Sequence, residues 1–240
     1  MEQRSEQNVC ILVVDDEQDI RRIIRILLES SGYQVAEAPN GLAAVEYIRQ
    51  QPNVDLVLMD IMMPEMDGLS AVAKIRETSN VPVLFLSAKS EDTDKILGLN
   101  IGADDYITKP FNPVELCARV RSHLRRYIQL GGAAAQNGAI MRVGGIVLND
   151  ESKAVTLDGE PVSLTPLEYS ILRLLMETPG KVFSSDEIYQ AVWNDAPYGA
   201  NATVAVHIRH LREKLEIDPA NPRYLKVLWG HGYKMEADNG

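Results

Sequence analysis

Hydrophobic and polar positions follow two periods through the first 128 residues. Short apolar runs of strand length occupy residues 10–14, 35–37, 54–59, 81–86 and 106–107. Between and after them, apolar residues recur every three or four positions, which predicts helices around residues 20–28, 41–50, 69–76, 92–100 and 113–127. Five strands interleaved with five helices predict right-handed crossovers and a parallel sheet covered on both faces. The fold class expected of residues 8–128 is α/β, a doubly wound five-stranded parallel sheet.

The pattern changes after residue 128. Apolar periodicity stops over residues 129–139, where the run from Gly131 to Gly138 is made of Gly, Ala, Gln and Asn, and this composition predicts a flexible linker. Beyond it we expect strands within 140–164, helices near 166–177, 185–193 and 201–216, and a closing hairpin whose apolar arms flank Gly230-His231-Gly232. Residues 140–236 should form a second domain of α+β type.

Composition limits the class of protein. Apolar residues make up 45% of the chain and charged residues 24%, as in ordinary globular proteins. No apolar run approaches the ~20 residues that span a bilayer, and the start of the chain is too polar for a signal peptide. We therefore expect a cytoplasmic protein with no membrane contact. Cys10 and Cys117 fit reduced, buried thiols better than a disulfide framework.

Net charge gives a weak argument against nucleic acid as a partner. The chain carries a formal charge of −10, and neither half is basic: residues 1–130 have 14 Lys and Arg against 20 Asp and Glu, and residues 131–240 have 10 against 14. Basic surface supplies most of the non-specific affinity for the phosphate backbone. Charge alone therefore does not predict DNA binding.

Polar side chains stand where four of the apolar runs end: Asp15 and Asp16, Asp60, Ser87, and Lys109. The carboxyl ends of parallel strands meet at one edge, and the first and third strands are neighbours in the flavodoxin-like order 2-1-3-4-5. Three carboxylates brought together repel one another unless a hard dication lies among them, and Mg²⁺ is the natural candidate. One carboxylate can then attack a phosphoryl group, while the Lys109 ammonium and the Ser87 hydroxyl stabilise its oxygens.

Each of these residues has a simpler explanation when it is taken alone. An acid at a strand end often caps the next helix, Ser87 suits a turn, and Lys109 suits a solvated surface. The combination at four strand ends is harder to explain in this way.

The same residues carry a family resemblance. The pattern Asp15-Asp16, Asp60-Ile-Met-Met-Pro64 with Asp67-Gly68, Ser87-Ala88 and Lys109-Pro110-Phe111 closely resembles the receiver domain of two-component response regulators over residues 8–128. The resemblance implies that Asp60 accepts phosphate from a sensor histidine kinase. It also implies that Asp15, Asp16, Asp60 and the backbone oxygen of Met62 hold one Mg²⁺, that Ser87 and Lys109 contact the phosphoryl oxygens, and that Lys109-Pro110 is a cis peptide.

Further roles follow from the resemblance. Tyr106 would be an aromatic switch that turns inward when Ser87 moves towards the phosphate, although a half-buried strand tyrosine is the alternative. Residues at the positions of intersubunit ion pairs predict a homodimer that forms on phosphorylation: Lys95, Asp104, Asp105, Glu115 and Arg119. The apolar Met62 and the long Lys89 beside the pocket would restrict water and make loss of the phosphoryl group slow, so we expect a phosphoacceptor and not an enzyme.

The predicted helix over residues 201–216 concentrates the cations of the second half. We expect Val204, Ile208, Leu211 and Leu215 to be buried, with Asn201 as the helix cap. The rest of its surface would carry Thr203, His207, Arg209, His210, Arg212 and Lys214. A basic stripe of this kind is more often a solvated helix face than a DNA contact.

A second resemblance favours DNA. The runs Leu164–Tyr169, Val204–Lys214 and Trp229–Tyr233 resemble the winged helix-turn-helix of the OmpR/PhoB subfamily over residues 140–236. It implies a helix in the major groove of double-stranded promoter DNA, a wing near the minor groove, and a loop over residues 193–200 that is offered to RNA polymerase. The DNA contacts that it implies are Thr203, His207, Arg209, His210, Arg212, Tyr233 and Lys234.

The chain departs from that pattern at one position of the wing and one of the recognition helix. Relatives often have arginine at the positions of Trp229 and His210, and a neutral indole or a mostly neutral imidazole attracts phosphate less. We therefore expect Trp229 to pack against its own domain, with Tyr233 and Lys234 touching DNA.

Together these patterns predict a transcription factor that is phosphorylated on Asp60, dimerises and binds tandem half-sites. An aspartyl-phosphate phosphatase of the haloacid dehalogenase type is a rival, but it needs a second Asp two residues after the nucleophile, and Asp15-Asp16-Glu17 lacks that spacing. A receiver-controlled adaptor, whose winged helix docks a protein in place of DNA, remains the alternative.

Overall fold

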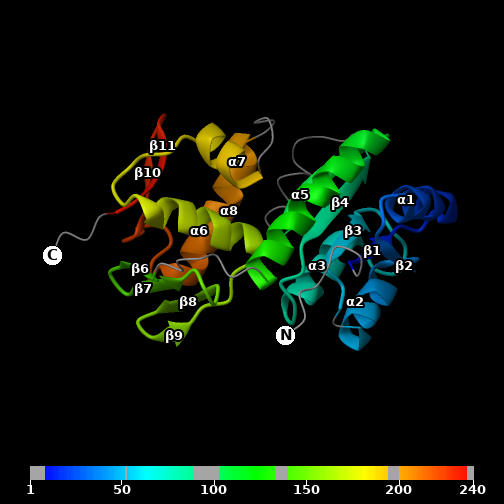
Figure 1. Cartoon of the computed structure of the whole chain (residues 1–240), viewed down its shortest axis with the longest axis horizontal. Coiled ribbons are helices and arrows are strands. Elements are labelled where there is room, and N and C mark those ends of the chain that lie inside the picture. The colour runs from blue at the N-terminus through cyan, green and yellow to red at the C-terminus, as the bar shows by residue number, and fades with distance from the viewer. Residues whose placement is uncertain (1–8, 52, 89–102, 133–139, 194–199, 237–240) are drawn as a thin grey trace. The chain divides into compact units, whose positions relative to one another are not determined.

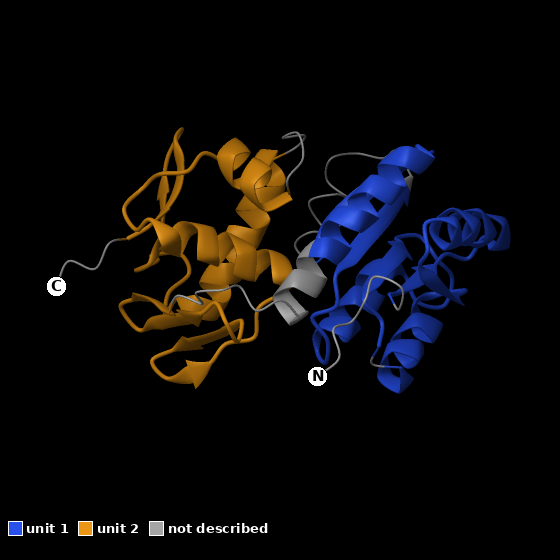
Figure 2. Cartoon of the chain, in the orientation of Figure 1, with its two compact units in different colours: residues 1–132 blue, residues 133–240 orange. Residues whose placement is uncertain are grey.

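The computed structural model describes residues 9–51, 53–88, 103–132, 140–193 and 200–236 (Figure 1). The chain divides into two compact units, residues 1–132 and 133–240, which are described separately (Figure 2). Among the described residues, no helix is long and apolar enough to cross a membrane.

The first unit has a five-stranded parallel sheet in the order β2-β1-β3-β4-β5. Its strands are β1 (Cys10–Val14), β2 (Gln34–Ala38), β3 (Leu56–Asp60), β4 (Val83–Ala88) and β5 (Asp105–Lys109). Its helices are α1 (Gln18–Ser30), α2 (Gly41–Gln50), α3 (Gly68–Arg76) and α5 (Pro113–Gly132). The predicted α/β class and strand order are confirmed, whereas the helix predicted near residues 92–100 lies outside the described residues.

Alternating side chains of the strands build two hydrophobic cores. Leu12, Val57 and Phe85 face the side that α2 and α3 cover, and Val13, Leu58 and Leu84 face the side that α1 and α5 cover. Because both faces are covered, the central strands β1, β3 and β4 are apolar at nearly every position. The polar groups that follow them are thereby confined to the edge where the strands end.

Local sequence explains how α2 and α3 begin beside that edge. The Asn40 side chain accepts a hydrogen bond from the backbone N–H of Ala43, and Asp67 accepts one from Ser70. Gly68 is required at the start of α3, since a Cβ atom there would lie 2.1 Å from the backbone oxygen of Asp60. The loop after β3 is thus held tightly against α3.

α5 continues to Gly132, so residues 129–132 of the predicted linker are helical. Tyr127, Ile128, Gln129 and Leu130 extend the run of residues compatible with helix before the two glycines weaken it. The rest of the predicted linker, residues 133–139, lies outside the described residues, and its flexibility stays a prediction.

The second unit contains a four-stranded antiparallel sheet, three helices and a hairpin. The sheet is formed by β6 (Ile140–Val143), β7 (Ile146–Asn149), β8 (Ala154–Leu157) and β9 (Glu160–Pro161). The helices are α6 (Pro166–Glu177), α7 (Ser185–Trp193) and α8 (Ala200–Leu215), and the hairpin pairs β10 (Leu225–Leu228) with β11 (Gly232–Met235). α8 starts one residue before Asn201, so Asn201 lies inside the helix and does not cap it.

Glu168 ties two of these helices together. It completes a capping box with Thr165 at the start of α6, and its Oε2 also lies 2.6 Å from Nζ of Lys214 on α8. The Glu168 side chain is buried, whereas the Lys214 side chain is 33% exposed, so the glutamate end of the ion pair is shielded from water. The same carboxylate therefore fixes α8 relative to α6.

The two cysteines are free and half-buried, less buried than predicted. Burial raises the pKa of the Cys10 thiol, which forms a hydrogen bond with Tyr47. An elevated thiol pKa lowers the thiolate fraction and with it the reactivity of the sulfur.

Candidate functional site

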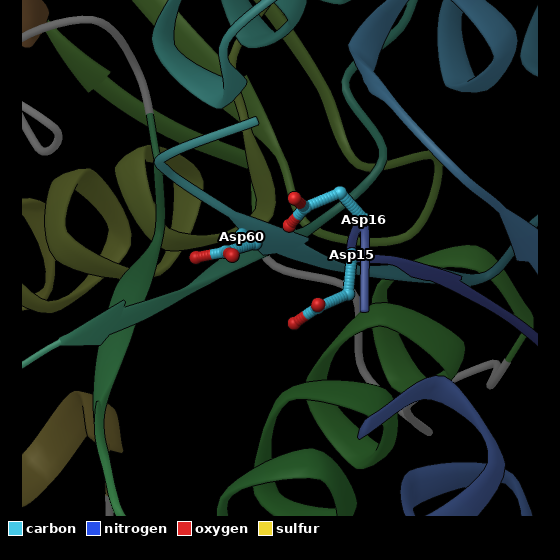
Figure 3. Close-up of side chains that lie close together, drawn as sticks. All are labelled: Asp15, Asp16 and Asp60. Carbon is cyan, nitrogen blue, oxygen red and sulfur yellow. The ribbon is translucent and has the colours of Figure 1, made fainter. Parts of the chain in front are cut away.

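Three carboxylates gather at the edge where β1 and β3 end. Asp15 and Asp16 follow β1, and Asp60 is the last residue of β3, its neighbour in the sheet (Figure 3). One carboxylate oxygen from each residue lies within 4.8 Å of the others. Asp15 is fully buried, Asp60 is 7% exposed and Asp16 is exposed. The cluster thus has a dry side and one side open to solvent.

Lys109, from the end of β5, binds two of these acids. Its Nζ lies 2.6 Å from Oδ2 of Asp15 and 3.0 Å from Oδ2 of Asp60. The peptide bond that follows it, Lys109-Pro110, is cis as predicted. The structure therefore brings together Asp15, Asp16, Asp60 and Lys109, as the sequence predicted.

The environment shifts the protonation of both partners. Burial raises the pKa of the Asp60 carboxyl and outweighs the hydrogen bond and charge of Lys109, which lower it. Burial alone would lower the pKa of Lys109, but its hydrogen bonds to Asp15 and Asp60 raise it. The lysine thus stays charged, while the Asp60 carboxylate is less stable in this setting than in water.

These groups have the chemistry of a magnesium site. Three carboxylates and one ammonium leave two negative charges, and a dication would balance them. Carboxylate oxygens are the ligands that hard cations prefer, and Mg²⁺ is usually held by one or two of them with water. The cluster can therefore bind Mg²⁺.

Neighbouring groups fix the acids in place. The backbone N–H of Glu17 donates to Oδ1 of Asp15 at 2.9 Å, and Nη1 of Arg21 donates to the backbone oxygen of Asp15 at 2.6 Å. Arg21 also pairs with Glu37 on β2. Sequence reasoning missed Arg21, because an arginine on an amphipathic helix carries no signal that distinguishes it from a solvated one.

Ser87 and Tyr106 occupy adjacent strands near the cluster. Ser87 is 3% exposed on β4, and the β4–β5 register pairs it with Thr108, two residues beyond the Phe85–Tyr106 pair. Because side chains alternate along a strand, Ser87 and Tyr106 face the same side of the sheet. Tyr106 is half-buried against the core that α2 and α3 cover.

The residues predicted to pair across a dimer are largely paired within the first unit. Nη1 of Arg119 lies 2.9 Å from Oδ2 of Asp105, and its Nε lies 3.1 Å from Oε1 of Glu115. Asp105 also contacts Nε2 of the buried His123 at 3.3 Å. Sequence reasoning missed His123, since one histidine in an amphipathic helix has no distinctive spacing.

The prediction for Asp104 is wrong. Its side chain is 1% exposed, and its Oδ2 accepts from Nη2 of Arg76 at 2.9 Å and from the backbone N–H of Val83 at 2.8 Å. A carboxylate buried in this way ties α3 to the start of β4 and is not presented to a second subunit. Lys95 and Lys89 lie outside the described residues.

In the second unit, most of the predicted DNA contacts on α8 are buried. Thr203 and His207 are each 2% exposed, and His210 is 9% exposed with its Nδ1 3.8 Å from Oε1 of Glu168. The predictions for these three residues are wrong, because α6 and α7 both pack on α8 and bury more than one stripe of it. The His207 ring lies 5.6 Å from the Trp193 ring, inside this packing.

Arg212 and Glu216 support the hairpin. Both Nε and Nη2 of Arg212 donate to the backbone oxygen of Leu225, at 3.0 and 2.7 Å, and the side chain is partly buried, so its contact with DNA stays a prediction. The Glu216 carboxylate accepts hydrogen bonds from the backbone N–H groups of Arg223, Tyr224 and Leu225. Nothing in the sequence signalled either role, because both depend on where β10 lies against the end of α8.

Arg209 on α8 and Trp229 in the hairpin are both exposed. The Arg209 side chain is 60% exposed on α8 and pairs with Glu213 one turn later at 2.8 Å. Trp229, at the turn of the hairpin, is 88% exposed. The expectation that Trp229 packs against its own domain is wrong.

Comparisons with known proteins agree with this arrangement. Residues 11–121 match the family model described as the response regulator receiver domain, and residues 159–235 match the one described as the C-terminal domain of transcriptional regulatory proteins. The chain is 43% identical to the regulatory protein VanR of Enterococcus faecium over 94% of its length and 98% of that protein. It is 40% identical to the alkaline phosphatase synthesis regulator SphR of Synechococcus elongatus over 94% of its length and 90% of that protein.

Solved structures support the fold as well. A mutant of the protein RitR superposes with a TM-score of 0.75 over 95% of this chain and 99% of that one, at 24% sequence identity. This likeness concerns the fold alone. The alignment with VanR covers 94% of this chain, so it extends over both units.

The charge balance of the acidic cluster generates a first prediction. Without Mg²⁺, Asp60→Asn should stabilise the receiver by about 1 kcal/mol, because it removes one of three mutually repelling charges from a dry site. Added Mg²⁺ should raise the unfolding midpoint of the wild type and of the control Glu46→Gln, an exposed acid of α2, and should have little effect on Asp60→Asn. Equal Mg²⁺ shifts in all three proteins would contradict the site.

Asp105 generates a second prediction. Burial by itself would raise the pKa of Asp105, but His123 and Arg119 outweigh it and lower the pKa. A lowered folded pKa stabilises the fold above the unfolded value of about 3.9 and loses that effect as the pH falls through the folded pKa. Asp105→Asn should therefore lower the free energy of unfolding by about 3 kcal/mol at pH 7, and this loss should become smaller in acid.

Glu115→Gln is the matched control, because it removes the exposed partner of the same arginine and should cost less than about 1 kcal/mol. Far-UV circular dichroism in urea at several pH values measures the free energy of unfolding of both variants. Tryptophan fluorescence separates the units, since Trp193 and Trp229 both lie in the second unit. A cost for Asp105→Asn that does not change with pH would count against this assignment.

Proposed function

We propose a mechanism for a protein that belongs to the OmpR/PhoB-type two-component response regulators, on the evidence of its two matched families and its full-length relatives. Such a protein is a phosphorylation-dependent, DNA-binding transcription regulator that interacts with a sensor kinase and with promoter DNA. The adaptor alternative is not favoured, because the second unit matches the transcriptional regulatory domain. The roles of individual residues below are our proposal.

Asp60 is the phosphoacceptor. It is the carboxylate that lies at a strand end between Asp15, Asp16 and Lys109. Its oxygen forms a bond to phosphorus as the bond from phosphorus to the kinase histidine breaks, and the imidazole leaves with the electron pair of that bond. The raised pKa of Asp60 supports this role, since a poorly solvated carboxylate has less hydration to lose when it attacks.

Asp15, Asp16, Asp60 and the backbone oxygen of Met62 hold Mg²⁺, which supplies positive charge to the phosphoryl oxygens. The Lys109 ammonium, now bound to Asp15 and Asp60, donates to a phosphoryl oxygen in the phosphorylated protein. The Ser87 hydroxyl donates to another. Met62, which is 77% exposed, flanks the pocket and slows hydrolysis of the phosphoryl group, and Lys89, expected to act with it, lies outside the described residues.

The structural effect of phosphorylation passes along β4 and β5. When Ser87 moves towards the phosphoryl group it leaves space on its face of the sheet, and Tyr106, half-buried on the same face, turns into it. This movement alters the surface of β5 and α5 and favours a homodimer. The Glu115 side chain, 47% exposed, accepts the partner subunit's Lys95, while Asp105 and Arg119 orient α5 through the ion pairs they already form.

Dimerisation makes DNA binding effective, because two linked output domains bind tandem half-sites with a high effective concentration for the second contact. Arg209 enters the major groove after releasing Glu213, at a cost of about 0 to 1 kcal/mol. Tyr233 and Lys234 of the hairpin contact the adjacent backbone. The loop over residues 193–200, of which 194–199 lie outside the described residues, meets RNA polymerase.

Phosphorylation of Asp60 is directly testable. With acetyl phosphate and Mg²⁺, the wild-type chain should gain the mass of one phosphoryl group and elute earlier from a sizing column, because the adduct promotes dimers. Asp60→Ala should do neither, whereas Asp67→Ala, which removes only the α3 cap, should keep the adduct. A wild-type chain that never gains the adduct, or an Asp60→Ala chain that does, would refute the assignment.

Binding of duplex DNA tests the role of Arg209. Arg209→Ala should weaken binding and reduce the slope of log K against log salt concentration by about 0.9, because one fewer phosphate counterion is released, if Arg209 contacts phosphate. A loss of sequence preference with an unchanged slope would instead show contact with a base edge. Arg142→Ala, an equal charge change on β6, is the control and should leave binding unaltered. Unchanged binding by Arg209→Ala would contradict the proposed orientation of α8.

A further inference from the structure

The side chains of Asp15 and Asp16 both reach the acidic cluster, although neighbouring residues of a strand point to opposite faces of the sheet. The two residues follow the end of β1, and the chain bends at Asp16. A carboxylate oxygen of each lies within 4.8 Å of an oxygen of Asp60 (Figure 3). The direction of the Asp16 side chain thus depends on the peptide unit that joins it to Asp15.

Arg21 of α1 holds that peptide unit. Its Nη1 donates a hydrogen bond of 2.6 Å to the backbone oxygen of Asp15, which is the carbonyl of the peptide bond to Asp16. The backbone N–H of Asp15 donates to the oxygen of Ala38 at 3.3 Å. Both backbone groups of Asp15 are therefore bound, and they fix the point from which Asp16 extends.

The carboxylates of the two aspartates are held differently. Oδ1 of Asp15 accepts from the backbone N–H of Glu17 at 2.9 Å, and its Oδ2 accepts from Nζ of Lys109 at 2.6 Å. Among the residues that the structure describes, none donates a hydrogen bond to the exposed side chain of Asp16. Asp16 is thus positioned through its backbone, and Arg21 contacts the peptide bond that leads to it.

Arg21 is fixed in turn by β2. Its Nε lies 3.3 Å from Oε2 of Glu37, and Oε1 of Glu37 lies 2.8 Å from Nη1 of Arg25, one turn further along α1. Glu37 pairs in register with Val13, so both side chains face the side of the sheet that α1 covers. The Arg21 side chain is 13% exposed, and a guanidinium with so little hydration depends on such partners. A side chain held in this way can orient the Asp15 oxygen.

We propose that Arg21 is a positioning residue of the metal site: by holding the peptide bond before Asp16, it keeps this carboxylate beside Asp60 and raises the affinity for Mg²⁺. The inference rests on the proposed binding of Mg²⁺ by the three acids. Groups that orient metal ligands without touching the metal change its affinity by about 10- to 100-fold. An arginine that acted through charge alone would have the opposite effect, because it would repel the dication. The sign of the effect therefore distinguishes positioning from charge.

Metal binding by full-length variants tests this inference. The probe is Mn²⁺, which takes the same oxygen ligands as Mg²⁺ and loses its sharp electron paramagnetic resonance signal on binding, and competition with Mg²⁺ gives the Mg²⁺ affinity. Arg21→Gln should bind Mg²⁺ about tenfold more weakly than the wild type. Arg21→Lys should also bind it more weakly, because one ammonium does not reproduce a planar fork that binds two acceptors.

Arg25→Gln is the matched control. It removes an equal charge, bound to the same Glu37, from a position one turn further along α1. Its Mg²⁺ affinity should stay within about twofold of the wild type, because the contact of Arg21 with Asp15 is kept.

Phosphorylation by acetyl phosphate provides a readout that a loss of folding would not imitate. At Mg²⁺ concentrations below the wild-type dissociation constant, Arg21→Gln should be phosphorylated about tenfold more slowly than the wild type. At saturating Mg²⁺ the two rates should be equal. An Arg21→Gln chain that stays slow at saturating Mg²⁺ would contradict the inference, because its defect would then not lie in metal affinity.

The outcomes separate this inference from the proposed function. If the wild type binds Mg²⁺ while Arg21→Gln binds it equally well or more tightly, positioning by Arg21 is refuted and the metal site stands. Equal weakening in Arg25→Gln and Arg21→Gln would also refute it, because the effect would then belong to α1 as a whole and not to the contact with Asp15. A wild-type chain that binds neither Mn²⁺ nor Mg²⁺ would refute the proposed metal site, and this inference with it.

Discussion

The bond from Lys109 to both Asp15 and Asp60 is the interaction on which the receiver depends. A parallel sheet brings the ends of β1, β3 and β5 to one edge, and here it brings acids that repel one another. One ammonium, 2.6 Å from Asp15 and 3.0 Å from Asp60, offsets part of the repulsion between the acids and leaves the cluster with a net negative charge. The residual negative charge suits a dication, and burial keeps the pKa of Asp60 raised.

In this cluster the acids repel one another while Lys109 attracts two of them. A newly bound group therefore changes the balance of forces within it. Any group that binds Lys109 or Ser87 more strongly than their present partners changes the forces on β4 and β5. Those strands are packed on both faces, so a local shift is transmitted and not absorbed. Tyr106 lies on the same face of the sheet as Ser87.

Several polar residues of the second unit have structural roles that their spacing in the sequence did not predict. Glu168, Arg212 and Glu216 are connectors that fix α6, α8 and the hairpin relative to one another. With Thr203, His207 and His210 buried, the exposed residues of α8 are Asn201, Ala202, Ala205, Arg209, Glu213 and Lys214. A domain with a net negative charge gains DNA affinity when two copies of it are paired.

The sequence by itself determined the receiver fold and the composition of its site. Strand and helix periods are local properties, and strand ends in a parallel sheet converge whatever the details of packing, so Asp15, Asp60 and Lys109 could be placed together in advance. Which side of α8 faces outward could not be predicted, because burial there depends on α6, α7 and the hairpin contacting the helix from several directions. The burial of Asp104 could not be predicted either, because it depends on an ion pair with Arg76 of α3. The exposure of Trp229 depends on the turn at Gly230 and on distant groups, such as Glu216, that hold the hairpin in place.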